Sequence, residues 1–254
     1  MIKKILRKIN SIFFNFKPKF YSEKNLTHVG TIYGGYDVFV EELNSPNIIS
    51  CGLGEDATFD IEMINRFNAN VISIDPTPRA LKHFNEIKFN FGKKRTTTAN
   101  ETGKLAISDY NLEKVSEKNF NFINKAIWKE NNKEIKLFFP KNEANVSLSI
   151  NKNPKFSEEY YLAQTINYQE ILNTYKLKKI DILKLDIEGA EIEVLWSVMK
   201  NLILPEQILV EFDIRRRPSI NSFFTLKKIH NNILNKYDLI GINKKGDFTY
   251  IKKK

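Results

Sequence analysis

The sequence predicts an α/β fold in which a mostly parallel sheet carries helices on both faces. Apolar, strand-like runs alternate with helix-like segments over residues 48–89 and again over 165–235, and this alternation is typical of a parallel sheet. Residues 237–251 have the pattern of a hairpin, which should add an antiparallel edge at the C-terminal end of the sheet. A chain of 254 residues is long enough for one domain with a sizeable core.

The order of the expected elements follows from apolar periodicity and from turn residues. A lead-in with a bend at Gly34 and Gly35 precedes the first strand, and residues 92–118 and 141–160 are expected to be loops. We expect strands at residues 48–51, 71–75, 120–128, 134–139, 180–186 and 207–212, and helices at about 57–67, 78–89, 168–175, 191–199 and 223–235.

Positive charge gathers at the two ends of the chain. The net charge is +10, and residues 1–24 hold seven basic side chains and one acidic while residues 227–254 hold eight and two. Basic ends around a slightly acidic middle suggest that the ends meet an anionic surface, rather than that a nucleic-acid groove crosses the fold. Solvated lysines in a Lys- and Asn-rich composition explain the charge equally well. We therefore expect no nucleic-acid partner.

The first segment has the pattern of a basic amphipathic helix that ends before Pro18. We divide the chain into this helix and a linker, residues 1–24, and a single domain, residues 25–254. The helix could lie on an anionic membrane surface or pack on protein, and the pattern fits both. Its apolar residues recur at helical spacing: Ile2, Ile5, Leu6, Ile9, Ile12, Phe13 and Phe16.

Cysteine content and hydropathy indicate the compartment. Cys51 is the single cysteine of the sequence, which excludes an internal disulfide and a Cys-based zinc site. No apolar run approaches the roughly 20 residues of a membrane span, and no signal-peptide core is present. We expect a cytoplasmic protein, with peripheral attachment to the inner membrane face as an option. The sequence predicts no oligomeric state.

The first expected strand ends in a glycine turn typical of a nucleotide-type cofactor site. Gly52, Gly54 and Ala57 give the spacing G-x-G-x-x-A, which suits both a dinucleotide and a methyl donor. Glu55 and Asp56 would repel a pyrophosphate but suit the cationic groups of S-adenosylmethionine. The alternative is that these two acids only complement a helix dipole from solvent.

Asp75 ends the second expected strand, where a carboxylate can accept hydrogen bonds from both ribose hydroxyls. The alternative is a turn or helix-capping role before Pro76. A second constellation lies at Lys184 and Asp186, which are two apart on an otherwise apolar strand and so share a face. Because buried charges are costly, they indicate either a site at the carboxyl edge or a structural ion pair.

The motifs taken together resemble the FkbM-type methyltransferase family. The strongest match is DILKLDIEGAE at residues 181–191, and the similarity extends in matching order over about residues 30–251. Other similar segments are SCGLGED at 50–56, FD at 59–60, IDPTP at 74–78, NKAI at 124–127, NVSL at 145–148 and LVEF at 209–212. After LVEF, the related branch usually has a His-rich patch, whereas this chain has DIRRRP.

The resemblance implies a Rossmann-like class I methyltransferase sheet and S-adenosylmethionine as the cofactor. It also implies a methyl acceptor that is usually an oxygen, in a small molecule or glycan. The donor contacts implied for this sequence are Gly52, Gly54, Glu55, Asp56, Asp75, Asn124 and Ala126, with Asp186 near the methyl group.

A hydroxyl acceptor must lose a proton during transfer, so a carboxylate base is useful. We expect Asp186 or Glu211 to serve, with Lys184 balancing the charge. A divalent cation held by hard oxygen ligands is the alternative activator, and its candidate ligands are Asp186, Glu188, Glu211 and Asp213. Two other functions stay open at this point, an NAD(P)-dependent oxidoreductase on the same fold and a catalytically inactive, membrane-associated binding protein.

Overall fold

The structure is a computed structural model, which describes residues 16–19, 26–41, 43–95, 105–141, 148–151, 156–216 and 219–254. Except for Phe16, the expected N-terminal helix lies outside the described residues. So do Arg217 and the expected NVS segment at 145–147.

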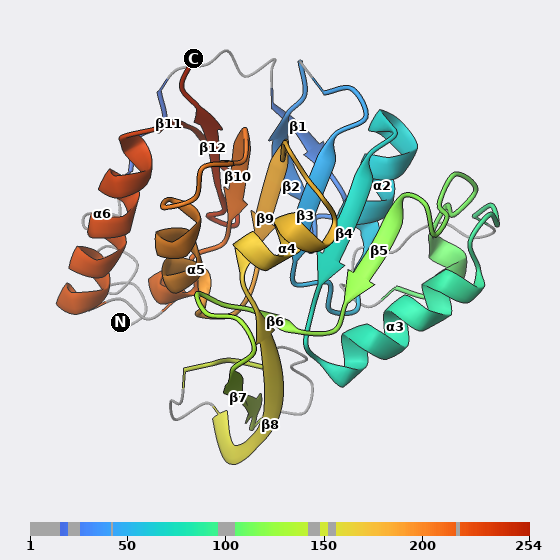
Figure 1. Cartoon of the computed structure of the whole chain (residues 1–254), viewed down its shortest axis with the longest axis horizontal. Coiled ribbons are helices and arrows are strands. Elements are labelled where there is room, and N and C mark those ends of the chain that lie inside the picture. Colours follow the sequence, from blue (N-terminus) through green and yellow to red (C-terminus); the bar gives the residue numbers. More distant parts are fainter. Residues whose placement is uncertain are drawn as a thin grey trace.

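A seven-stranded sheet forms the centre of the molecule (Figure 1). β3, β4, β5, β9 and β10 run parallel, as the alternating pattern predicted. β12 runs antiparallel to β10, and β11 pairs antiparallel with β12 at the edge. The predicted C-terminal hairpin is therefore confirmed, with its antiparallel strand one place in from the edge. The sheet order is β11 (Tyr237–Ile242), β12 (Phe248–Lys252), β10 (Gln207–Val210), β9 (Ile182–Leu185), β3 (Asn47–Cys51), β4 (Asn70–Ile74) and β5 (Phe120–Ile123).

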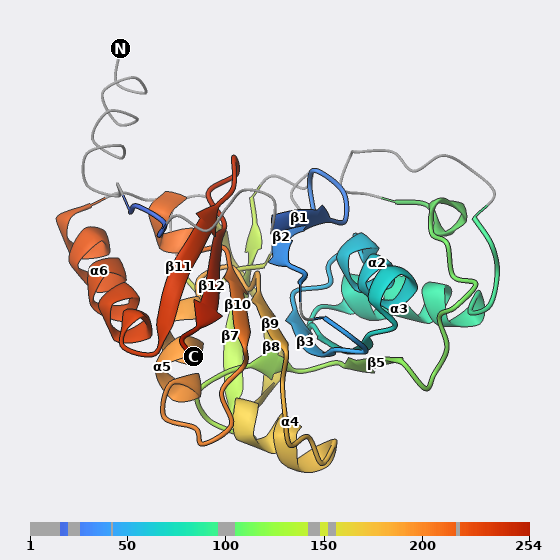
Figure 2. The ribbon, with the colours of Figure 1, turned by 90° about the horizontal axis from the view of Figure 1, so that it is seen from above.

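Helices cover both faces of this sheet (Figure 2). Successive strand residues point to opposite faces, so Ile49 and Cys51 pack in one apolar core with α4, α5 and α6, while Ile48 packs in the other core with α2 and α3. These two cores hold the layers together. The helices are α2 (Thr58–Phe67), α3 (Pro78–Phe89), α4 (Tyr168–Thr174), α5 (Glu191–Val198) and α6 (Ile220–Leu234), and the short 3-10 turns are η2 (Ile107–Asp109) and η3 (Asp213–Arg216).

A second, three-stranded sheet projects beyond the carboxyl ends of the central strands (Figure 1). Its order is β6 (Ala126–Ile127), β8 (Phe156–Ile166) and β7 (Glu134–Pro140). Two expectations were wrong here. The single strand expected at 120–128 divides into β5 and β6, which belong to different sheets, and the loop expected at 141–160 contains the start of β8. β8 is largely solvent-exposed and is stabilised by pairing with β7, so its sequence lacks a strong apolar alternation.

The lead-in contains a hairpin where only a bend was expected. β1 (Leu26–Val29) pairs antiparallel with β2 (Tyr36–Phe39), and the Gly35 N–H closes the turn onto the Thr31 carbonyl at 2.8 Å. No helix in the described part of the chain combines the length and the apolar character that a membrane span requires.

Two buried tyrosines near the C-terminal hairpin allow a test of the core. The Tyr237 hydroxyl donates to the Pro205 carbonyl at 2.6 Å, whereas the Tyr168 hydroxyl has no partner among the described residues. Tyr237→Phe should lower the free energy of unfolding by about 1–2 kcal/mol, because it leaves a buried acceptor unpaired. Tyr168→Phe should not lower it, and should raise it by up to about 1 kcal/mol, because it removes a buried hydroxyl without a partner among the described residues. Chemical denaturation measures both, and equal losses in the two variants would contradict this account.

Candidate active site

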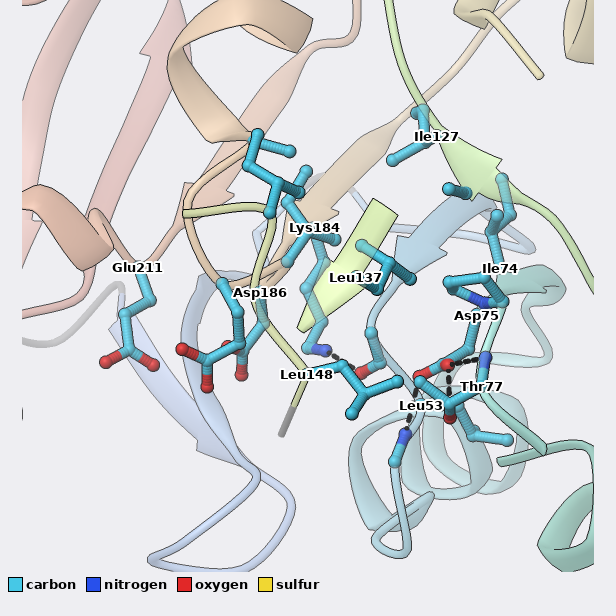
Figure 3. A pocket seen from close by; sticks show the side chains of 18 of the residues that line it. Leu53, Ile74, Asp75, Thr77, Ile127, Leu137, Leu148, Lys184, Asp186 and Glu211 are labelled. Carbon is cyan, nitrogen blue, oxygen red and sulfur yellow. Dashed lines mark hydrogen bonds between the residues drawn. The ribbon is translucent and has the colours of Figure 1, made fainter. Parts of the chain in front are cut away.

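A cavity of about 400 Å³ lies at the carboxyl ends of β3, β4 and β9, between the central sheet and the small sheet (Figure 3). This edge is where ligands bind in open α/β sheets, and the volume is in the range of small-molecule sites. The small sheet and the segment between its strands β7 and β8 contribute an apolar wall. The residues that form this wall are Ile127, Ile135, Leu137, Leu148 and Ile150.

The glycine turn after β3 packs directly on the neighbouring strands. Gly52 has a φ of +91°, and a Cβ there would collide with the Asp186 carbonyl oxygen. Its N–H donates to the Ile74 carbonyl at 2.9 Å. Gly54 has a φ of +55° with open space around it. Glycine at position 52 is therefore required by a backbone contact, and glycine at position 54 only by its conformation.

Asp75 organises the turn at the end of β4. One carboxylate oxygen accepts from the Gly54 N–H at 3.0 Å, and the other accepts from the Thr77 N–H at 2.8 Å and hydroxyl at 2.7 Å. The cap of α3 is Thr77 itself, so Asp75 is not the capping residue. Burial raises the pKa of Asp75. The Asn124 side-chain amide donates to the backbone carbonyl of Asp75 at 2.9 Å and so helps to fix this turn.

The two acids of the glycine turn differ in their surroundings. Both oxygens of Asp56 are engaged, one by Thr58 and one by the Thr31 hydroxyl at 2.6 Å. Glu55 also lines the cavity, and its Oε2 is buried without a hydrogen-bond partner among the described residues. An orphaned buried carboxylate oxygen is costly unless a ligand completes it. Glu55 is thus the acid that a cationic ligand group would match.

Lys184 supports the glycine turn through a hydrogen bond to its backbone. Its side chain is buried, and its ammonium donates to the Gly52 carbonyl at 3.0 Å. The same ammonium lies 5.3 Å from the centre of the Tyr36 ring. It also faces Asp60, whose pKa burial raises to about 6 while Lys184 opposes the shift. The partner of Lys184 is therefore the turn backbone rather than the Asp186 carboxylate.

Asp186 and Glu211 form the other end of the cavity. They follow β9 and β10, and Figure 3 shows their carboxylates pointing the same way beyond the strand ends. Burial and the nearby Asp186 raise the pKa of Glu211 to about 8, while Arg216 opposes the shift. Arg216 forms ion pairs with both Glu211 and Glu188. A carboxyl group with a pKa near neutrality thus lies beside a second carboxylate.

The family comparison fits this geometry. The model of the methyltransferase FkbM domain matches residues 37–234. The chain belongs to the FkbM methyltransferase family. It is accordingly an S-adenosylmethionine-dependent methyltransferase, as the motifs predicted.

Comparison with solved structures found similar chains at low sequence identity, three of which follow, and no curated protein sequence matches. A fibrillarin/Nop5p complex aligns at 8% identity over 83% of this chain and 73% of that one, with a TM-score of 0.43. The Methanococcus jannaschii fibrillarin aligns at 12% identity over 84% and 69%, with a TM-score of 0.40. M. jannaschii TYW2 in complex with AdoMet aligns at 12% identity over 92% and 90%, with a TM-score of 0.31.

The cavity of this FkbM methyltransferase fits S-adenosylmethionine. The Glu55 oxygen without a partner among the described residues suits the ammonium group of the donor. Asp75 has room for a ribose hydroxyl at the oxygen that accepts only from Gly54, because its other oxygen already accepts two hydrogen bonds from Thr77. The apolar wall suits the adenine. Gly52, Gly54, Ala126 and Asp186, for which the resemblance implies donor contacts, also line the cavity. Asn124 contacts the backbone of Asp75 and is not among the lining residues.

The acidic end does not support a divalent cation. Among the described residues, no group of three or more His, Cys, Asp or Glu side chains has the arrangement to hold a metal ion. Two of the four candidates, Glu188 and Glu211, are instead bridged by the Arg216 guanidinium. Asp213 lies behind the turn at Gly189, where a Cβ would come within 3.5 Å of its carboxylate.

Sequence reasoning missed two parts of the cavity. The wall from β7 was not expected to reach the site, and Lys245 was not assigned to it, whereas the bend at residues 33–36 was expected as a possible border of the cofactor and contributes Tyr33 and Gly34. The Gly34-Gly35 bend was a weak signal for a segment at the cofactor. The sequence carried no signal for Lys245, because lysines are common in hairpin turns.

Two glycine variants test the turn. Gly52→Ala should lower the free energy of unfolding by about 3 kcal/mol or more and remove binding of S-adenosylhomocysteine, because backbone atoms must separate. Gly54→Ala should cost about 1–2 kcal/mol for its left-handed conformation alone. Denaturation and calorimetry measure the two effects. Equal tolerance of both variants would show that the contact with Asp186 does not constrain the turn.

Proposed function

We propose that this methyltransferase methylates a hydroxyl group of a sugar, a glycan or a related small molecule. The observation that carries the proposal is the pair of carboxylates at the far end of the cavity. Glu211 has a pKa of about 8 beside Asp186, and a base with a pKa near the working pH is well matched to taking a proton from a hydroxyl.

When bound, S-adenosylmethionine supplies a methyl group on a positively charged sulfur; a nucleophile takes the methyl group and the sulfur is the leaving group. Glu55 and Asp75 hold the donor at the glycine turn. Asp186 and Glu211 orient the acceptor hydroxyl toward the turn and accept its proton. Positioning of this kind lowers the barrier because the two reactants no longer have to find each other in solution. Lys184 contributes by fixing the Gly52 carbonyl rather than by touching the acceptor.

Arg216 has a supporting electrostatic role. Its guanidinium pairs with Glu211 and favours the ionised form of that carboxyl group. Without Arg216, burial and the Asp186 charge would raise the pKa further, and less of the base would be ionised near neutral pH. The ion pair therefore keeps the proposed base available.

Ligand binding separates this proposal from an oxidoreductase on the same fold. S-adenosylmethionine and S-adenosylhomocysteine should raise the melting temperature, and NAD should not, because Glu55 would repel a pyrophosphate. Glu55→Gln should weaken binding about tenfold or more by removing a charge-assisted hydrogen bond to the donor ammonium. Glu41→Gln, an exposed loop variant, is the control. Stabilisation by NAD alone would refute the assignment.

The pH dependence tests the acceptor end. With an acceptor found in a methylation screen, kcat/KM should rise as pH increases through about 8, because Glu211 must lose its proton to act as a base. Glu211→Gln should remove that limb and lower kcat/KM about 100-fold, within the usual range for a lost general base. Asp186→Asn should also lower it. If both variants kept full activity and still bound the donor, neither carboxylate would be the catalytic base.

A further inference from the structure

We propose that the turn between β1 and β2, residues 31–35, forms the acceptor side of the cavity, and that the exposed ring of Tyr33 is the platform on which a neutral sugar ring lies. This inference rests on the proposed function and specifies it further, since it names the residue that recognises the acceptor. It concerns a segment that the family match at residues 37–234 leaves out.

Tyr33 lies among the carboxylates of the acceptor end. It lines the cavity, yet 54% of the residue is exposed. Partial burial raises the pKa of its hydroxyl, and the nearby charges of Asp186, Glu188 and Glu211 add to the shift. A large aromatic ring left open beside a cavity indicates a binding surface.

This combination matches the chemistry of a sugar. A pyranose ring has an apolar C–H face, which can lie on an aromatic face, and a rim of hydroxyls, which carboxylates can accept. Tyr33 supplies the flat apolar surface, and Asp186 and Glu211 supply the acceptors beside it. A sugar lying on Tyr33 would therefore present its hydroxyl rim to the proposed bases.

The turn that carries Tyr33 is fixed to the cofactor side of the site. The Thr31 hydroxyl donates to Asp56 at 2.6 Å and accepts from the Gly34 N–H at 2.9 Å. The Thr31 N–H donates to the Thr58 hydroxyl at 3.0 Å. Gly34 packs so closely that a Cβ would lie 2.7 Å from the Asp56 carboxylate. A platform held this way binds with little loss of conformational entropy.

Lys245 fixes the same turn from the opposite side. Its ammonium donates to the Tyr33 carbonyl at 2.7 Å and to the Gly35 carbonyl at 3.1 Å, and it pairs with Asp247 at 3.2 Å. It also lies 5.1 Å from the centre of the Tyr36 ring. Lys245 comes from the turn between β11 and β12, beyond the family match. It is a positioning residue for the Tyr33 platform.

The charges of the cavity favour a neutral acceptor. Within the described residues, three cations line the cavity, and each already bonds a protein oxygen: Lys184 the Gly52 carbonyl, Lys245 the Tyr33 carbonyl and Arg216 the Glu211 carboxylate. An anionic sugar would meet Asp186 and Glu211 with no uncommitted cation in this lining. Hydroxyls, which donate to carboxylates, fit better than phosphate or carboxylate groups.

Saturation-transfer NMR on the full chain loaded with S-adenosylhomocysteine tests the platform. The probes are neutral methyl hexopyranosides and methyl 6-deoxyhexopyranosides, with a methyl uronide as the anionic comparison. We expect transfer to the C–H protons of one face of a neutral glycoside, with weaker binding of the uronide. Tyr33→Ala should weaken glycoside binding about tenfold, while Tyr33→Phe retains it. Tyr160→Ala is the control, because Tyr160 is half-exposed on β8 and does not line the cavity.

The outcomes separate the two proposals. If S-adenosylhomocysteine binds but no glycoside does, or if Tyr33→Ala binds glycosides as well as the unchanged protein, the sugar platform is wrong. If Tyr33→Ala loses S-adenosylhomocysteine instead, Tyr33 belongs to the donor site and the inference is also wrong. If the unchanged chain binds no S-adenosylhomocysteine, the donor assignment itself fails.

The role of Lys245 has its own variants. Lys245→Met should weaken glycoside binding about as much as Tyr33→Ala and leave S-adenosylhomocysteine affinity unchanged, because it releases the turn and not the donor. Lys245→Arg should restore binding, since a guanidinium can donate to both carbonyls. If Lys245→Met leaves glycoside affinity unchanged, Lys245 does not position the Tyr33 platform. The same conclusion follows if Lys245→Arg binds S-adenosylhomocysteine but does not restore glycoside binding.

Discussion

The close contact between Gly52 and the backbone of Asp186 is the constraint on which the site depends. It brings the ends of β3 and β9 together so tightly that no side chain fits at position 52. The Asp186 N–H donates to the Cys51 carbonyl at 3.1 Å, and Lys184 completes the junction through the Gly52 carbonyl. Because of this junction, the glycine turn and the backbone of Asp186 form one connected unit.

Hydrogen bonds extend that unit in both directions. Toward the donor, Gly54 is tied to Asp75, whose turn is supported by Asn124. Toward the proposed acceptor, Asp56 is tied to Thr31 in the hairpin that carries Tyr33. The two acids that follow the glycines thus differ in role. Glu55 has a carboxylate oxygen that a ligand could contact, whereas Asp56 connects the glycine turn to the β1–β2 hairpin. Contacts with this one turn therefore position both the proposed donor site and the proposed acceptor site.

The electrostatics of the cavity are consistent with a base that needs no metal ion. Burial and Asp186 hold the pKa of Glu211 near neutrality, and Arg216 limits the rise. The same guanidinium pairs with Glu188, which uses two of the carboxylates that were candidate metal ligands. Arg216, from the DIRRRP segment, therefore supplies a structural cation to this end of the site.

The sequence by itself determined the local parts of the protein. Apolar runs with flanking turns were enough for β3, β4, β9 and the helices of the described residues. Gly52, Gly54, Asp75 and Asp186 could be predicted to lie at one site because they follow strands whose carboxyl ends meet at one edge of the sheet. Tertiary structure alone decided the parts built by distant pairing. β8 depends on β7, and Lys245 reaches Tyr33 across 212 residues of sequence. Local periodicity records which face of an element is buried, but it does not record which distant segment covers that face. The apolar wall from β7 and the contact of Lys245 with the Tyr33 turn therefore emerged only from the fold.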